Sequence, residues 1–174
     1  MTKWLWGVVL VVSLSGCGYT TKGFVYEHDR IVVVPAVDKI SITAENRKYS
    51  QYQSYPVLLE KRFTSVLVGR FNRDGHLKVT SNKADALLLE CVITDYQKEA
   101  VRYSDSDDVR EQRLRLHVLM KLSNARGETI KERDVVGESS FFLVGPNRKS
   151  EAVAQGELID DAARRIVEAV VEEW

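Results

Sequence analysis

A regular alternation of side chains between positions 113 and 122 is the feature that most constrains the fold of this chain. The even positions are apolar: Leu114, Leu116, Val118, Met120 and Leu122. The odd positions are Arg113, Arg115, His117, Leu119 and Lys121, four of which are polar. Successive side chains of a strand point to opposite faces of its sheet. Residues 110–123 are therefore predicted to form a strand with one face in a core and the other in water.

The segments on either side of this strand are predicted to pair with it as two hairpins. Residues 86–103 begin with an apolar run, become polar toward their end and lead into a solvated acidic turn at 104–108. Residues 129–143 follow a second turn at 124–127 that ends in glycine, the residue best suited to a positive φ. This half of the sheet should therefore be antiparallel.

A strand, a helix and a second strand precede the hairpins. The β-branched run in residues 30–36 indicates a strand buried on both faces. Residues 55–72 have an apolar stripe at helical spacing, with Pro56 in the first turn and Asp74-Gly75 as the stop. Residues 76–80 then form a short strand. Because β-α-β crossovers are right-handed, the two strands should be parallel.

Residues 37–54 form a polar, irregular stretch within which 39–43 could be a short edge strand. The final helix is expected to begin after Ser150, whose hydroxyl can cap it. Its wetter flank offers two i,i+4 ion pairs, Asp160 with Arg164 and Asp161 with Arg165.

Two helices with one apolar stripe each can cover only one face of a sheet. The predicted fold class is therefore α/β of the α+β type, arranged as a two-layer sandwich. Its mixed parallel and antiparallel sheet has four to five strands and carries both helices on one face.

The first 17 residues indicate export and lipidation. Lys3 precedes an apolar run that is too short to span a bilayer as a helix, which needs roughly 20 residues. Leu14, Ser15 and Gly16 then match a bacterial lipobox ahead of Cys17. Residues 1–16 are predicted to be a lipoprotein signal peptide, 17–29 the lipidated cysteine and tether, and 30–174 a single domain. The alternatives are an ordinary signal peptide with a chance cysteine, or a short buried helix.

Lipidation of Cys17 would anchor the protein through a diacylglycerol thioether and an N-acyl chain such as palmitate, and no other cofactor is expected. Three acyl chains give a permanent anchor, since each buried methylene contributes about 0.8 kcal/mol. Gly18 follows the cysteine, and by likeness to enteric lipoproteins it favours the outer membrane. Cys91, the second of the two cysteines, is expected to be buried as a small hydrophobe.

No motif in the sequence supports an enzyme. The three histidines are scattered, no nucleophile stands beside a base, and neither a metal-ligand spacing nor a phosphate-binding glycine loop occurs. The chain has 25 basic and 25 acidic residues, whereas a dedicated nucleic-acid binder usually has a basic excess. We therefore expect neither a metal, nor a catalytic residue, nor a nucleic-acid partner.

Basic side chains on the long central hairpin are the candidate binding residues. On charge alone they could meet phosphates or carboxylates of a glycolipid, because arginine matches such groups with a bidentate fork. The alternative is ordinary decoration of a solvated strand. The candidates are Lys98, Arg102, Arg110, Arg113, Arg115 and Lys121.

The sequence resembles the LptE-type lipopolysaccharide-assembly lipoproteins over most of the mature chain. The segments that carry the resemblance are Cys17-Gly18-Tyr19, Ile31-Val32-Val33-Val34-Pro35, Asn46-Arg47-Lys48-Tyr49, Arg73-Asp74-Gly75-His76-Leu77-Lys78-Val79, Ala84-Asp85-Ala86-Leu87-Leu88 and Tyr103-Ser104-Asp105 through Val109-Arg110-Glu111-Gln112-Arg113-Leu114. The resemblance implies a lipid-anchored outer-membrane protein that faces the periplasm or the lumen of a barrel. Its implied partners are lipopolysaccharide and the β-barrel lipopolysaccharide translocon of the LptD type, which it would plug and help to assemble.

A second hypothesis belongs to another class, a periplasm-facing lipoprotein that activates a cell-wall synthesis enzyme. Such regulators share the tether and the absence of catalytic residues, but they usually have longer, proline-rich tethers. Here residues 18–29 span about 40 Å at full stretch. A tether this short keeps the domain near its membrane and favours the barrel partner.

Overall fold

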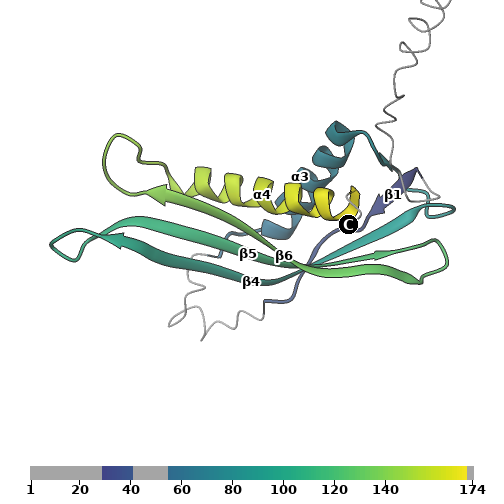
Figure 1. The fold of residues 1–174 in the computed structure, drawn as a ribbon, viewed down its shortest axis with the longest axis horizontal. Coiled ribbons are helices and arrows are strands. Elements are labelled where there is room, and N and C mark those ends of the chain that lie inside the picture. The colour runs from purple at the N-terminus through teal and green to yellow at the C-terminus, as the bar shows by residue number, and fades with distance from the viewer. Residues whose placement is uncertain (1–28, 41–54, 172–174) are drawn as a thin grey trace, which may run out of the picture.

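Both helices lie on one face of a mixed sheet in the computed structural model, which describes residues 29–40 and 55–171 (Figure 1). The elements are β1 (Arg30–Val33), β2 (Val37–Asp38), α3 (Leu59–Asp74), β3 (Lys78–Val79), β4 (Leu87–Tyr103), β5 (Val109–Ser123), β6 (Thr129–Phe142) and α4 (Glu151–Val171). The predicted two-layer α+β class is confirmed.

The sheet has the order β3-β1-β4-β5-β6, with β2 also paired to β4. β1 is parallel to both β3 and β4. The parallel arrangement predicted for the strands before and after the first helix, which are β1 and β3, is therefore confirmed. The β4–β5 and β5–β6 pairs are antiparallel hairpins, as expected. Within the described ranges the sheet has six strands, because the two-residue strand β2 adds to the four to five that were expected.

Pro35 explains why the first predicted strand is split. β1 ends at Val33, and β2 resumes at Val37 along the same edge of β4. The amide of Ala36, between them, donates to the Oγ1 of Thr64 on α3 at 2.9 Å. The strand therefore does not run to residue 36. Val37 and Asp38 pair with β4, and the Lys39 amide donates to the Ile93 carbonyl at 3.1 Å. Residues 41–43 of the edge strand considered at 39–43 lie outside the described residues, so that strand stays a prediction.

The alternation in β5 sets the core. All five apolar residues on its even positions are completely buried against the helices. On β4 the residues Leu87, Leu89, Cys91 and Ile93 form the matching buried row, so the predicted burial of Cys91 is confirmed. Burial raises the pKa of the Cys91 thiol to about 12, so it packs as a neutral hydrophobe.

α3 begins later than the sequence indicated. Leu58 has a left-handed backbone with φ of 60°, so the helix starts at Leu59 and Pro56 lies ahead of it instead of in its first turn. Tyr55, also ahead of the helix, packs edge-on against Tyr96 with ring centroids 5.6 Å apart. The predicted stop is confirmed, because Gly75 at φ 76° donates its amide to the carbonyl of Phe71.

α4 begins as predicted, with the Val153 amide donating to the Ser150 hydroxyl at 3.3 Å. The pair of Asp161 with Arg165 forms at 2.8 Å. The expected pair of Asp160 with Arg164 does not form. Asp160 instead binds Arg70 of α3, which ties the two helices together.

Arg164 forms its ion pairs with Asp161 and Glu168 of its own helix instead.

Among the described residues, no helix combines the length and the apolar character that crossing a membrane requires.

Candidate functional site

The structure distributes the predicted binding residues over four places. Lys98 lies on the helix side of β4 and donates to the carboxylate of Glu151 at the start of α4, at 2.6 Å. It therefore fastens α4 to the sheet. Leu14, Ser15, Gly16 and the lipidation residue Cys17 lie outside the described residues, and their role stays a prediction.

The open face of the sheet is balanced in charge at its centre. Arg115 donates to Glu138 at 2.7 Å and to Glu99 at 3.2 Å, so its guanidinium lies between acids of both neighbouring strands. Arg113 stands in register with the same Glu99. Because each cation here has a carboxylate beside it, this part of the face does not form a basic patch.

Lys121 lies far from the hairpin tip, beside a shallow groove of about 250 Å³ on the open face. The groove walls include the apolar residues Val34, Val92 and Leu119. Glu90 and Glu132 are the register partners of Lys121 on the two neighbouring strands. Its surroundings are thus acidic and apolar.

Arg102 and Arg110 are the two candidates that the fold brings together. They line a groove of about 370 Å³ at the tip of the β4–β5 hairpin, which we call the tip groove. The other lining residues are Ser104, Asp108, Val109, Phe142, Val144 and Gly145. The end of β4, the start of β5 and the loop after β6 therefore all contribute to it.

The guanidinium of Arg102 has two contacts in this groove. It lies over the ring of Phe142, 5.9 Å from the centroid, in a cation–π arrangement. Its Nε is 3.6 Å from the carboxylate of Glu111. The side chain is nonetheless two-thirds exposed, so an external anion can reach it.

The acidic turn beside the groove is organised by its own hydrogen bonds. Ser104 and Asp108 close the turn through their backbones at 2.8 Å, and the Asp108 amide also donates to the Ser104 hydroxyl. Asp107 has a φ of 62°, a conformation that aspartate tolerates better than most residues. Within the described ranges, no three histidine, cysteine or acidic side chains gather as metal ligands would.

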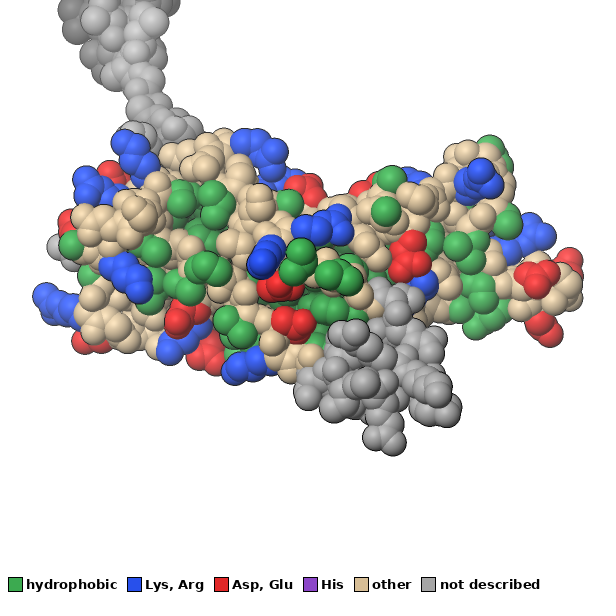
Figure 2. Space-filling model, turned by 180° about the vertical axis from the view of Figure 1, so that it is seen from behind, with side chains coloured by type: hydrophobic (Ala, Val, Ile, Leu, Met, Phe, Trp, Pro, Cys, Tyr) green, Lys and Arg blue, Asp and Glu red, His purple; other side chains and the backbone are tan. Residues whose placement is uncertain are grey.

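Apolar side chains line the tip groove at Val109, Phe142 and Val144, and others on the same part of the chain are exposed to solvent. Tyr103 is 55% exposed and Val144 is 50% exposed, and Val101, Leu143 and Val153 are exposed as well. In Figure 2 the narrow end of the molecule, at the right, carries apolar and basic side chains side by side, with acidic ones at the extremity. The site therefore combines guanidinium groups with an apolar surface.

The sequence alone did not identify the loop after β6 as part of this site. The sequence predicts a strand that ends at Leu143, whereas β6 ends at Phe142 and both Leu143 and Val144 lie in the loop that follows. A signal was available, because two apolar residues directly before Gly145-Pro146 stand at a turn. The Leu143 amide donates to the Arg110 carbonyl at 2.9 Å, which places this loop against the hairpin.

Comparison with known proteins identifies a family match over most of the domain. The family model LptE, described as lipopolysaccharide-assembly, matches residues 37–172. No curated protein sequence matches the chain.

Solved structures share the fold at low sequence identity. A lipoprotein B from Nitrosomonas europaea is 15% identical with a TM-score of 0.54, covering 89% of this chain and 91% of that one. A minor lipoprotein from Acinetobacter baumannii is 16% identical with a TM-score of 0.51, covering 83% and 93%. A hypothetical protein from Chlamydia trachomatis is 12% identical with a TM-score of 0.52, covering 82% and 95%.

Proposed function

We propose, because this chain belongs to the LptE family of lipopolysaccharide-assembly proteins, that it is the lipoprotein partner of the β-barrel lipopolysaccharide translocon and that it binds lipopolysaccharide at the tip groove. The family is a non-enzymatic one. The domain would be held at the outer membrane by lipid on Cys17, with the short tether of residues 18–29 keeping it close to that membrane.

The observation that supports glycolipid binding is the mixed chemistry of the tip groove. Lipopolysaccharide presents phosphate groups next to acyl chains. Arg102 and Arg110 offer guanidinium forks for phosphate, and Phe142 and the half-exposed Val144 offer apolar surface in the same groove. The open face around Arg115 is a weaker candidate, because its arginine is already occupied by two carboxylates.

The alternative function, activation of a cell-wall synthesis enzyme, is not favoured by the family assignment. The family description concerns lipopolysaccharide assembly over most of the domain. No feature of the described residues points to a cell-wall enzyme as the partner.

The binding proposal is tested with purified lipopolysaccharide and the full-length protein in detergent. The double variant Arg102→Glu with Arg110→Glu should bind at least about tenfold more weakly, because two phosphate contacts are replaced by repulsion. The variant Arg126→Glu is the matched control, since this exposed arginine lies in the opposite turn of the β5–β6 hairpin. Equal affinity of the double variant and the control for lipopolysaccharide would contradict binding at the tip groove.

A further inference from the structure

The outer edge of β6 presents backbone groups to solvent. Among the described strands β6 pairs with β5 alone. Two hydrogen bonds show which residues point away from β5: the Glu138 amide donates to Asp161, and the Phe142 carbonyl accepts from the Lys149 amide. Because this direction alternates along a strand, the N–H and C=O groups of Glu132, Asp134 and Val136 also point outward.

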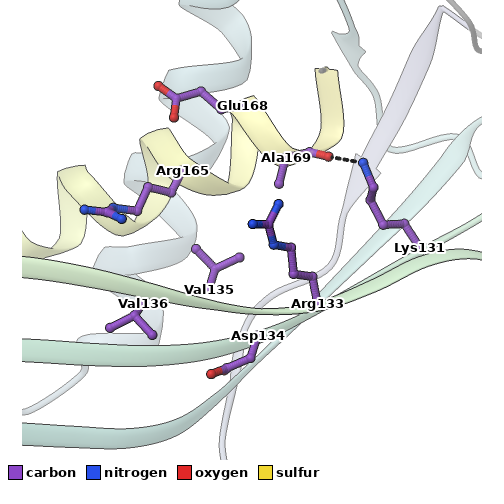
Figure 3. A pocket seen from close by; sticks show the side chains of 8 residues that line it. All are labelled: Lys131, Arg133, Asp134, Val135, Val136, Arg165, Glu168 and Ala169. Carbon is purple, nitrogen blue, oxygen red and sulfur yellow. Dashed lines mark hydrogen bonds between the residues drawn. The ribbon is translucent and has the colours of Figure 1, made fainter. Parts of the chain in front are cut away.

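A groove runs between this edge and the C-terminal half of α4. It has a volume of about 480 Å³, and Figure 3 shows the Arg133 side chain directed into it from β6. Lys131 reaches across it to the Ala169 carbonyl of α4 at 2.8 Å. Arg165 and Glu168 line the α4 side, and the Glu168 carboxylate is paired with Arg164 of the same helix. The groove side of the edge is thus basic.

The far end of the edge is closed by α4. The Glu138 amide donates a hydrogen bond to the Asp161 carboxylate at 3.0 Å, so it cannot pair with an added strand. At Gly137 the helix is so close that an added Cβ would lie 2.6 Å from the Cβ of Ala162. A strand added to β6 would therefore have to end opposite Val136.

The charges on this edge act against pairing with a second copy of the same edge. Lys131 and Arg133 point to the groove side, whereas Glu132 and Asp134 point to the open face. An antiparallel pair of two β6 edges centred on Arg133 would place Arg133 opposite itself and Glu132 opposite Asp134. Centring on Glu132 would place Lys131 opposite Arg133. Like charges directly opposite destabilise a strand pair.

We propose that the β6 edge between residues 131 and 136 accepts an extended segment of a partner protein as an added antiparallel strand. The segment would carry acidic side chains toward Arg133 and Lys131, and basic side chains on the open face toward Glu132 and Asp134. Backbone hydrogen bonds would give affinity and the alternating charges would give specificity. This interaction goes beyond the proposed function and involves neither the tip groove nor glycolipid.

A peptide of alternating charge tests this proposal on the full-length protein in detergent. The probe is acetylated, amidated Thr-Glu-Lys-Glu-Lys-Glu-Thr. Its control is Thr-Glu-Glu-Lys-Lys-Glu-Thr, which has the same composition but mixes charges on each face. The probe should bind about tenfold more tightly than the control, and Arg133→Glu should abolish this preference whereas Arg126→Glu should keep it. Hydrogen exchange should slow at the amides of Glu132, Asp134 and Val136 and stay unchanged at Glu138.

N-methylation of the peptide separates strand addition from simple charge attraction. In an antiparallel added strand the lysine amides face β6, so methylating them should abolish binding, while methylating the glutamate amides should not. The proposal is overturned if the two peptides bind equally, if no peptide binds, or if methylated glutamates are the ones that abolish binding. Inorganic phosphate producing the same exchange pattern would make the groove an anion site. Concentration-dependent protection without peptide would assign the edge to a second copy. Either result would also overturn the proposal.

Discussion

The carboxylate of Asp161 on α4 accepts a hydrogen bond from the backbone amide of Glu138 on β6 at 3.0 Å. The same carboxylate binds Arg164 and Arg165 of its own helix. One side chain therefore joins the helix layer to the edge of the sheet and satisfies an amide that points away from β5.

Asp161 should make the stability of the domain depend on pH in the acid range. Burial alone would raise the pKa of this carboxyl, but hydrogen bonds from the Glu138 amide, Arg164 and Arg165 outweigh burial and lower it. A lowered pKa in the folded state gives a contribution that is present above the unfolded value of about 4 and is lost as pH falls through the folded value. Asp161→Asn should therefore cost about 1 kcal/mol at pH 7 and less near pH 2.

Urea unfolding of the wild type and Asp161→Asn at several pH values checks this linkage. Asp105→Asn is the control, because Asp105 lies on the exposed tip turn. A stability difference between wild type and Asp161→Asn that is the same at pH 7 and pH 2 would contradict the assigned role.

Gly137→Ala should destabilise the domain by about 1–3 kcal/mol. The new Cβ would lie 2.6 Å from the Cβ of Ala162 and 2.9 Å from its backbone, so either β6 or α4 must shift. Gly156→Ala is the matched change on α4: nothing lies within 4 Å of its Cβ, and the helix interior favours alanine by about 0.5–1 kcal/mol. In a thermal unfolding experiment, the Tm of Gly137→Ala should be lower than that of the wild type, and the Tm of Gly156→Ala should be higher. An unchanged or raised Tm for Gly137→Ala would refute the close approach of β6 and α4.

Thr64→Val should destabilise the domain by about 1–3 kcal/mol, although the two side chains have nearly the same shape. The Thr64 hydroxyl accepts from the Ala36 amide at 2.9 Å and donates to the Glu60 carbonyl at 2.8 Å. Valine would leave the Ala36 amide without that acceptor next to the break made by Pro35. Thr64→Ser retains the hydroxyl and should recover most of the loss in a denaturant titration. If Thr64→Ser and Thr64→Val lower the free energy of unfolding equally, the hydrogen bonds of the Thr64 hydroxyl do not stabilise the domain.

The sequence could predict the layers of this fold because they follow from local patterns. The alternation around Val118 identified β5 and its buried face, and Ser150 marked the start of α4. The partner of Asp160 could not be predicted, because Arg70 is 90 residues away and the crossing of α3 and α4 decides the contact. The start of α3 was missed because the left-handed conformation of Leu58 has no signal in its residue type.

The candidate site was predicted only in part for a related reason. Arg102 and Arg110 were chosen by charge and do share a groove. Phe142 and Val144, which complete it, come from a segment whose position depends on the register of β6 against β5. That register also decides that Arg115 is paired with Glu138. Charge counting along one hairpin cannot reveal acids supplied by a neighbouring strand.

Co-purification tests the central proposal, partnership with the lipopolysaccharide translocon, most directly. The tagged full-length protein is isolated from detergent-solubilised envelopes, and the proteins bound to it are identified by mass spectrometry. We predict recovery of one large outer-membrane β-barrel, with surface lipopolysaccharide reduced when the lipoprotein is depleted. Recovery of a peptidoglycan synthase in place of a barrel, with surface lipopolysaccharide unchanged, would contradict the account.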